Sequence, residues 1–263
     1  MPRPATGYFA PSLPRLLAHR GLATSAVENT LPAFRAAAQQ GALYVECDVH
    51  ASLDGVAIVA HDPDLSRLLG IASTIGSLTA RELAALDLGG GVGFCTLQDA
   101  LVALPATRFN IDVKSEAAAG PTGAAIVAAG AQQRVLLTSF SNARRKAAIR
   151  ASAGTSGVAV ATSASARTFL VVLVAGTLGL APVVRWLLRN VDAVQVPETA
   201  LGLRVPTRRM LALIHSAGVE MHVWTINDPQ KMAQLLAVGV DGLVTDRVDL
   251  ALELVARTKP NRR

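Results

Sequence analysis

Apolar runs of strand length alternate with Ala-rich segments of helical period along almost the whole chain. We expect eight strands, at residues 16–21, 43–49, 108–115, 135–140, 157–163, 192–198, 220–226 and 242–246. Strands separated by helices form a parallel sheet with the helices outside it. Eight such units in 263 residues predict an α/β fold of the (β/α)8 TIM-barrel class. A doubly wound open sheet is the main alternative, but the chain has no GxGxxG or P-loop motif.

Composition agrees with helices packed around a parallel sheet. The apolar fraction is 51% and the aromatic fraction only 4%, so the core must consist mainly of Ala, Val, Leu and Ile. The net charge of +6 is interpreted as a generally basic surface. No nucleic-acid partner is expected, because the basic run at the C-terminus is short and has no interleaved aromatic residues.

The cysteines and the N-terminal residues bear on the cellular compartment. Cys47 and Cys95 give neither a disulfide framework nor a metal-binding spacing. Cys47 is expected to be a small buried residue on the opposite face of its strand from its two acidic neighbours. The first 15 residues contain four prolines and no apolar signal-peptide core. A reducing, cytoplasmic location is therefore expected.

One domain is expected at 16–258, between an N-terminal extension at 1–15 and a basic tail at 259–263. An insertion at about 50–105 separates the second and third strands. It contains an extra strand in DGVAIVAHD and helices around LTARELAALDL and TLQDALVAL. The insertion follows the carboxyl end of the second strand, the face on which barrel enzymes carry their active sites.

The segment NTLPAFRAAAQQG carries the local signals of a helix on the outside of the barrel. Asn29 or Thr30 is a suitable N-cap, Pro32 falls in the first turn, and Gly41 follows the last helical residue. These signals predict where the helix after the first strand begins and ends.

Acidic side chains interrupt two of the predicted strands. Glu46 and Asp48 share one face of LYVECDV, and Asp112 and Lys114 share one face of NIDVKS. Uncompensated charges buried in a sheet cost several kcal/mol. If the two strands are neighbours, a divalent cation would compensate the three carboxylates, and all-oxygen ligands favour Mg²⁺ or Ca²⁺ over Zn²⁺. The alternative is an ion-paired set in which Arg20 and Lys114 neutralise the acids.

Two histidines end strands that point to the same mouth. His19 ends the first predicted strand, and His61 ends the extra strand of the insertion. Imidazoles titrate near neutral pH, so this pair is a candidate for acid/base catalysis beside a metal. The other three histidines are expected to have no catalytic part, although His222 is placed to point into the barrel. Asp62 is expected to be a loop former.

The order of short motifs resembles the glycerophosphodiester phosphodiesterase family. The motifs are HRG, ENT, ECD, DG followed by HD, NIDVKS, QVPE, HVWTIND and GLVTD, between about residues 16 and 250. The resemblance implies a barrel, one divalent cation, and hydrolysis of a phosphodiester to an alcohol and glycerol 3-phosphate.

The same resemblance implies roles for individual residues. His19 and His61 match the catalytic histidines of the family, and Glu46 and Asp48 match its metal ligands. Asp112 matches a third ligand position that more often holds Glu, so its reach to the metal is shorter by one methylene. Either histidine can be the acid, and the nucleophile can be water or a hydroxyl of the substrate glycerol.

Three further residues match substrate-binding positions of the family. Arg20 and Lys114 correspond to basic groups near the phosphate, and Trp224 corresponds to an aromatic residue that lines the substrate pocket. Val27 stands where the family usually has Pro. Two alternatives remain open: a lysophospholipase D-type activity on lysophospholipids, and a phospholipid-binding barrel without turnover.

An unusually apolar segment, 167–190, follows the fifth strand. No charge lies between Phe169 and Val184, but this run is shorter than the ~20 residues of a membrane-spanning helix. Pro182 should divide it into two helices. It is either a core helix of the outer ring or an apolar lip, including Val172 and Leu173, at the mouth of the barrel. A lip would hold an acyl chain, contact a membrane peripherally or form a homodimer, with Arg167, Arg185 and Arg189 near lipid phosphates.

Overall fold

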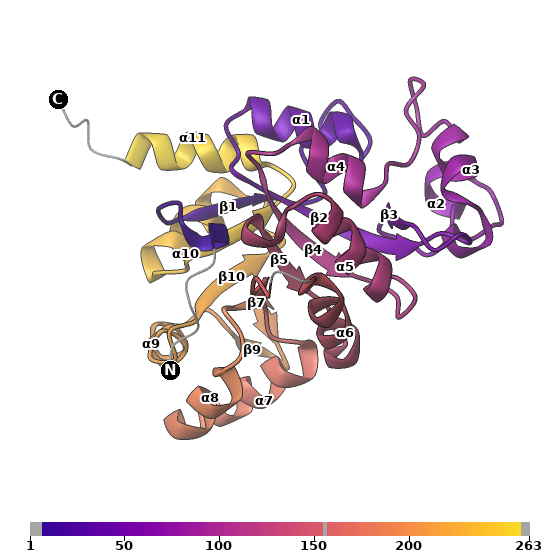
Figure 1. Cartoon of the computed structure of the whole chain (residues 1–263). Helices are drawn as coiled ribbons and strands as arrows, with labels where there is room; N and C mark the ends of the chain where they lie inside the picture. Colours follow the sequence, from indigo (N-terminus) through magenta and orange to yellow (C-terminus); the bar gives the residue numbers. More distant parts are fainter. Residues whose placement is uncertain (1–6, 155–156, 259–263) are drawn as a thin grey trace.

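In the computed structural model, which describes residues 7–154 and 157–258, eight parallel strands form a barrel surrounded by helices (Figure 1). The strands follow the order β6-β5-β4-β2-β1-β11-β10-β7. A parallel bridge between Ser163 and Ala193, and a hydrogen bond from the Asp192 N–H to the Thr162 carbonyl, bring the two end strands together. The predicted barrel is confirmed, and the open-sheet alternative is wrong. The strands are β1 Arg15–Ala18, β2 Tyr44–Ala51, β4 Arg108–Val113, β5 Val135–Thr138, β6 Ala161–Thr162, β7 Ala193–Pro197, β10 Glu220–Trp224 and β11 Gly242–Thr245.

Helices between consecutive strands cover the outside of the barrel and bury its outward-facing aliphatic residues. Thr30, not Asn29, caps the first of them, because its hydroxyl accepts the Ala33 N–H. The larger helices are α1 Leu31–Gln39, α5 Ala119–Ala128, α6 Asn142–Ser152, α7 Ala166–Thr177, α8 Ala181–Leu188, α9 Arg208–His215, α10 Pro229–Val238 and α11 Val248–Thr258.

Seven of the eight strands are shorter than predicted, and the differences at β1 and β6 have visible causes. β1 ends at Ala18, because Arg20 and Gly21 have positive φ angles, 56° and 87°, that turn the chain out of the sheet. His19 therefore lies just beyond the strand, although its N–H still bonds the Thr245 carbonyl. β6 contains two residues, since its pairing with β5 begins at Ala161.

The segment after β2 folds back on the barrel and has a small core of its own. β3 (Ala57–Val59) pairs antiparallel with β2 and leads directly to His61. The short helices α2 (Ser66–Leu69) and α3 (Ala80–Ala85) follow, and α4 (Leu97–Ala103) returns to the barrel. Their apolar side chains bury Ile58, Leu65, Ile75, Leu83 and Phe94 in one cluster. This packing fixes the position of His61.

The amino-terminal end of the barrel interior is closed by residues before β1. The short helix Gly7–Phe9 inserts Tyr8, which is fully buried, edge-on against the Tyr44 ring. Arg15 bonds the Glu220 carboxylate at 2.5 and 2.6 Å and the Tyr44 hydroxyl at 2.7 Å. The described part of the predicted extension thus contributes to the barrel core. The predicted basic tail, 259–263, lies outside the described residues, and the domain limits stay a prediction.

The apolar segment forms two helices, as Pro182 predicts: α7, and α8 with Pro182 in its first turn. The expectation that Val172 and Leu173 form an outward lip is wrong, because both side chains are buried in the main core. They lie on the inner face of α7, which packs on α9. No helix in the described part of the chain has the length and apolarity to cross a bilayer. The cytoplasmic location stays a prediction.

Replacement of Tyr8 tests the contribution of this closure to stability. Tyr8→Ala removes a buried aromatic ring and should lower the free energy of unfolding by about 3–5 kcal/mol. Tyr8→Phe should leave it unchanged or slightly higher, because the Tyr8 hydroxyl has no hydrogen-bond partner among the described residues. Urea unfolding at equilibrium measures both. Equal losses in the two variants would contradict the packing explanation.

Candidate active site

A pocket of about 450 Å³ opens at the carboxyl ends of the barrel strands. It brings together all eight residues selected from the sequence: His19, Arg20, Glu46, Asp48, His61, Asp112, Lys114 and Trp224. They come from β2, β4 and β10 and from the residues that directly follow β1, β3 and β4. The carboxyl ends of parallel strands meet at one face of a barrel, which explains this convergence. Their individual roles stay predictions.

The three acids are buried side by side at the mouth. Asp48 lies directly opposite Asp112 in the β2–β4 pairing, and Glu46 lies on the same face of β2 as Asp48. Cys47 points the other way, into the core between sheet and helices, as predicted. Burial and the neighbouring Asp48 charge raise the pKa of Glu46 to about 8. Burial also raises the pKa of Asp112, although Lys114 opposes this effect.

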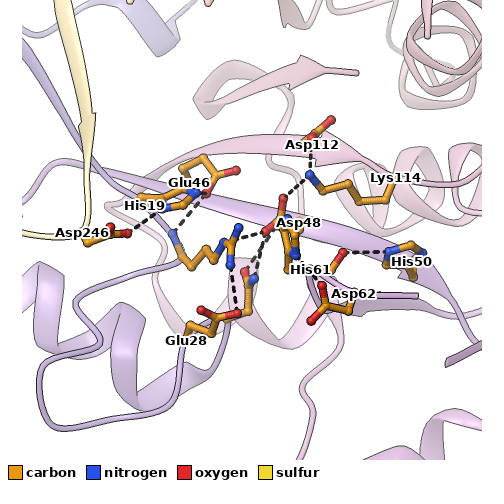
Figure 2. A network of polar contacts seen from close by, with 12 residues as sticks. His19, Glu28, Glu46, Asp48, His50, His61, Asp62, Asp112, Lys114 and Asp246 are labelled. Carbon is orange, nitrogen blue, oxygen red and sulfur yellow. Dashed lines mark hydrogen bonds and ion pairs between the residues drawn. The ribbon is translucent and has the colours of Figure 1, made fainter. Parts of the chain in front are cut away.

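Lys114 and Arg20 supply positive charge to these acids. The Lys114 ammonium lies 2.8 Å from Asp48 Oδ1 and 2.7 Å from Asp112 Oδ2 (Figure 2). Burial alone would lower the pKa of Lys114, but the two carboxylates raise it. Arg20 contacts Asp48 through Nε at 3.3 Å, and its backbone N–H donates to Glu46. The ion-paired arrangement considered from the sequence is therefore present.

The fit of a divalent cation can be tested against the donor atoms. Among the described residues, no three or more His, Cys, Asp or Glu side chains form an assembled metal cluster. The chemistry of the donors nevertheless fits a hard cation, because the three acids offer only oxygen. Asp112 Oδ1 is buried and has no hydrogen-bond partner in the described part of the chain. A buried carboxylate oxygen of this kind is normally satisfied by a hydrogen-bond donor or a cation.

Each candidate catalytic histidine is held by an aspartate. His19 Nδ1 lies 2.6 Å from Asp246 Oδ1, and His61 Nδ1 lies 2.7 Å from Asp62 Oδ1 (Figure 2). Asp246 also accepts a hydrogen bond from Asn227. A carboxylate at Nδ1 favours the tautomer that carries hydrogen there and leaves Nε2 free to exchange a proton. Asp62 lies in a loop, as expected, and its contact with His61 adds to that expectation.

The aspartates were missed for different reasons. Asp62 follows His61 directly, and this adjacency was the available signal. Asp246 follows β11, and only the pairing of β1 with β11 brings it to His19. Because the hydrogen bond from His19 stabilises its charged form, the pKa of Asp246 is lowered.

Two residues of the ENT motif make hydrogen bonds at the charged side of the pocket, Asn29 with Asp48 and Glu28 with two arginines. The Asn29 amide nitrogen donates to Asp48 Oδ2 at 3.0 Å, while its oxygen accepts the Asp48 N–H. Glu28 accepts hydrogen bonds from Arg20 and from Arg67. The motif was noted in the sequence, but no spacing rule showed which side chains it would contact.

The other wall of the pocket is apolar. Trp224 meets Phe140 edge-on, with ring centroids 6.3 Å apart. Phe169 and Leu170 at the start of α7 and Ala200 after β7 continue this wall. The pocket thus has a charged side that suits a phosphate group and an apolar side that suits a hydrocarbon group. His222, by contrast, is fully buried and contacts Glu220 below the pocket.

Comparison with known proteins identifies this arrangement. The sequence model of the glycerophosphoryl diester phosphodiesterase family matches residues 19–250. The chain belongs to this family. A probable glycerophosphodiester phosphodiesterase 2 of Mycobacterium tuberculosis is 38% identical over 243 residues, covering 92% of this chain and 90% of that protein. The predicted family and enzyme class, a phosphoric diester hydrolase acting on glycerophosphodiesters, are confirmed.

Solved structures agree with the family assignment. A glycerophosphodiester phosphodiesterase of Thermotoga maritima has a TM-score of 0.69 at 27% identity, covering 91% of this chain and 97% of that one. A phosphodiesterase of Oleispira antarctica, in complex with the product sn-glycerol-3-phosphate, has a TM-score of 0.72 at 24% identity, covering 93% of this chain and 97% of that one.

One sequence relative covers only part of the chain. A lysophospholipase D of Rattus norvegicus is 32% identical over 115 residues, covering 39% of this chain and 37% of that protein.

The turn that follows His19 depends on Gly21. Comparison with Gly41, which has a similar φ angle, separates the cost of backbone strain from the cost of a clash with Ala33. Gly21 and Gly41 have φ angles of +87° and +93°, but a Cβ would meet the Ala33 backbone carbon at 2.7 Å only at Gly21. Gly41→Ala should lower the free energy of unfolding by about 1–2 kcal/mol. Gly21→Ala should lower it by about 1–3 kcal/mol more. Urea unfolding measures the difference, and equal losses would contradict the close contact.

Proposed function

We propose that hydrolysis depends on a divalent cation and on general acid/base catalysis by His19 and His61. The observation that supports this most directly is that both imidazoles, each held by an aspartate at Nδ1, line the same pocket as the three buried acids. A phosphodiester bound there would meet proton-transfer groups and positive charge together. The expected products are an alcohol and glycerol 3-phosphate.

Glu46, Asp48 and Asp112 would hold the cation, and their all-oxygen donors suit Mg²⁺ or Ca²⁺. When bound, such an ion supplies positive charge to the non-bridging phosphate oxygens. The unpartnered oxygen of Asp112 supports its part in this site. Lys114 would leave its place between Asp48 and Asp112 or share these carboxylates with the ion.

Arg20 and Lys114 would bind the phosphate from the protein side. Their side chains already reach the edge of the acid cluster, and both line the pocket. Charge-assisted hydrogen bonds to phosphate oxygens would orient the substrate and spread the negative charge of the transition state. Trp224 would pack against the uncharged part of the substrate.

The two histidines would divide the proton transfers. One imidazole accepts the proton of the nucleophile, which is water or a hydroxyl of the substrate glycerol, and the other donates a proton to the leaving alkoxide as the P–O bond breaks. Where the glycerol hydroxyl attacks, water opens the resulting cyclic phosphate in a second step. Protonation matters because an alkoxide is a poor leaving group, and general acid/base assistance contributes roughly 10²–10⁴-fold. Asp246 and Asp62 would hold the rings in the orientation that keeps Nε2 toward the pocket.

A glycerophosphodiester is the proposed substrate class. The Oleispira antarctica phosphodiesterase of the same fold binds sn-glycerol-3-phosphate, which supports a glycerol phosphate subsite here. The apolar wall formed by Phe140, Phe169 and Leu170 favours a second candidate, lysophospholipase D-type hydrolysis of a lysophospholipid. A phospholipid-binding barrel without turnover fits less well, because the chain belongs to an enzyme family.

Alanine substitutions test the assigned histidines. His19→Ala and His61→Ala should each lower kcat on glycerophosphocholine by at least about 10²-fold. Cation binding, followed by isothermal titration calorimetry, should persist because neither ring is an assigned ligand. His215→Ala is the matched control, since His215 lies on α9 outside the pocket. Near-normal kcat in either pocket variant would reject the role of that histidine.

Chelation tests whether turnover depends on the cation, and turnover of three phosphodiesters tests the substrate class. EDTA should abolish turnover, and Mg²⁺ or Ca²⁺ should restore it. Asp112→Asn should weaken cation binding by at least about tenfold, whereas Asp112→Glu should retain it. Release of the head-group alcohol, choline or ethanolamine, is compared on glycerophosphocholine, glycerophosphoethanolamine and lysophosphatidylcholine. Undiminished turnover after chelation would overturn the cation dependence, and faster turnover of lysophosphatidylcholine would favour the second candidate.

A further inference from the structure

The outward face of α7 is apolar, which is unusual for a helix on a protein surface. Leu170, Val171 and Val174 of α7 and Leu178, its C-cap residue, are 41 to 68% exposed, and the other exposed residues of the helix, Arg167 and Thr177, lie toward its two ends. The inner face of the same helix is also apolar and packs in the core. A surface helix normally carries polar residues on its outer side, so this apolar face calls for a partner.

The apolar face continues onto the neighbouring helix. α8 packs against α7 and exposes Val183 and Trp186, the latter by 60%. Figure 1 shows α7 and α8 side by side at one edge of the molecule. We call these side chains the apolar rim, which consists of Leu170, Val171, Val174, Leu178, Val183 and Trp186.

The charged residues of the segment that carries the apolar rim have one sign. The segment from Ala166 to Asn190 contains Arg167, Arg185 and Arg189 but no acidic residue. All three arginines are exposed, and the Arg189 guanidinium lies 4.3 Å from the centroid of the Trp186 ring. Exposed aliphatic residues, an exposed tryptophan and arginines are the residue types with which proteins bind the surface of an anionic phospholipid membrane.

The apolar rim adjoins the pocket. Leu170 belongs to both, because it is exposed on α7 and also lines the pocket. On the same apolar wall, Ala200 lines the pocket from the hairpin β8 (Thr199–Ala200) and β9 (Leu203–Arg204). The hairpin exposes Leu201 and Leu203 beside it. Any flat surface that covered the rim would therefore lie next to the entrance of the pocket.

We propose that the apolar rim docks peripherally on an anionic phospholipid membrane, with α7 and α8 lying in the plane of the interface. Spanning is not involved, since α7 has 12 residues and a length of about 18 Å. The docked orientation would turn the pocket mouth toward the lipid headgroups. This last step rests on the proposed function, whereas the docking itself does not.

A second copy of the chain fits the rim less well than a membrane. In a symmetric dimer the same patch faces itself, so the three arginines of one copy would approach those of the other. No acidic residue of the segment is available to pair with them. An anionic headgroup layer offers the missing negative charge over the whole patch.

Vesicle co-sedimentation tests the proposal on the full chain, in EDTA and without substrate. The vesicles contain phosphatidylcholine alone or phosphatidylcholine with phosphatidylglycerol. The double variant Val174→Asp/Leu178→Asp changes the rim without touching the pocket. The matched control, Val102→Asp/Leu53→Asp, introduces the same charge at exposed residues on α4 and in the β2–β3 turn.

The wild type and the control should bind the phosphatidylglycerol vesicles, and binding should weaken with added salt. The rim variant should bind them at least about tenfold more weakly. Equal binding by the rim variant and the wild type, or no binding by the wild type, would overturn the proposal. So would light scattering that finds a wild-type dimer which the rim variant converts to a monomer.

Turnover of glycerophosphocholine without vesicles separates this proposal from the proposed function. The rim variant should keep the wild-type kcat there, because Val174 and Leu178 lie outside the pocket lining. If the wild type binds vesicles but does not hydrolyse glycerophosphocholine, the proposed function fails and the docking surface stands. If it hydrolyses this substrate but does not bind vesicles, the docking surface fails alone.

Discussion

Three carboxylates buried at the mouth of a barrel are the constraint on which the site depends. Asp48 and Asp112 face each other across neighbouring strands, with Glu46 beside them, and their mutual repulsion must be offset before the barrel can close. The compensating groups arrive from separate segments, which include the Lys114 ammonium, the Arg20 turn and the Asn29 amide. Asp112 and Lys114 share one segment, but the partners of Glu46 and Asp48 come from others, so the charged cluster is complete only when β1, β2, β4 and the turn before α1 have come together.

The charged mouth is compatible with an apolar core because the two faces of a strand point to different surroundings, one toward the helices and one into the barrel. On β2, Cys47 and Val49 join the aliphatic core under the helices, while Glu46 and Asp48 point into the barrel. The opposite end of the interior is filled by Tyr8 and by the pair Arg15–Glu220. Burial raises the pKa of Glu220, but the hydrogen bonds and charges of His222 and Arg15 together lower it, so its pKa is below the ordinary value and this paired acid stays charged. The charge at the mouth is less completely paired, which leaves it available to a ligand.

Sequence periodicity sufficed for the barrel, the acid cluster and the two histidines, because each depends on a spacing of two residues or on a strand end. It failed where a contact joins distant segments. Asp246 meets His19 only through the pairing of β1 with β11, and Tyr8 reaches the barrel core from a segment without strand or helix period. It also failed for Val172 and Leu173, since a helix that is apolar all round gives no phase from which to tell its buried face.

The packing of α7 does not explain why its outer face, which belongs to the apolar rim, is apolar. The inner face fixes the helix, and Gly176 permits such a close approach to α9 that a Cβ there would lie 2.6 Å from the Met210 methyl group. The core contacts therefore do not require Val174 or Leu178 on the outer face to be apolar. In water, polar residues at these two positions would leave the packing on α9 unchanged and would reduce exposed apolar surface. Their apolar character thus has no explanation within the folded chain, and contact with an apolar surface outside it supplies one.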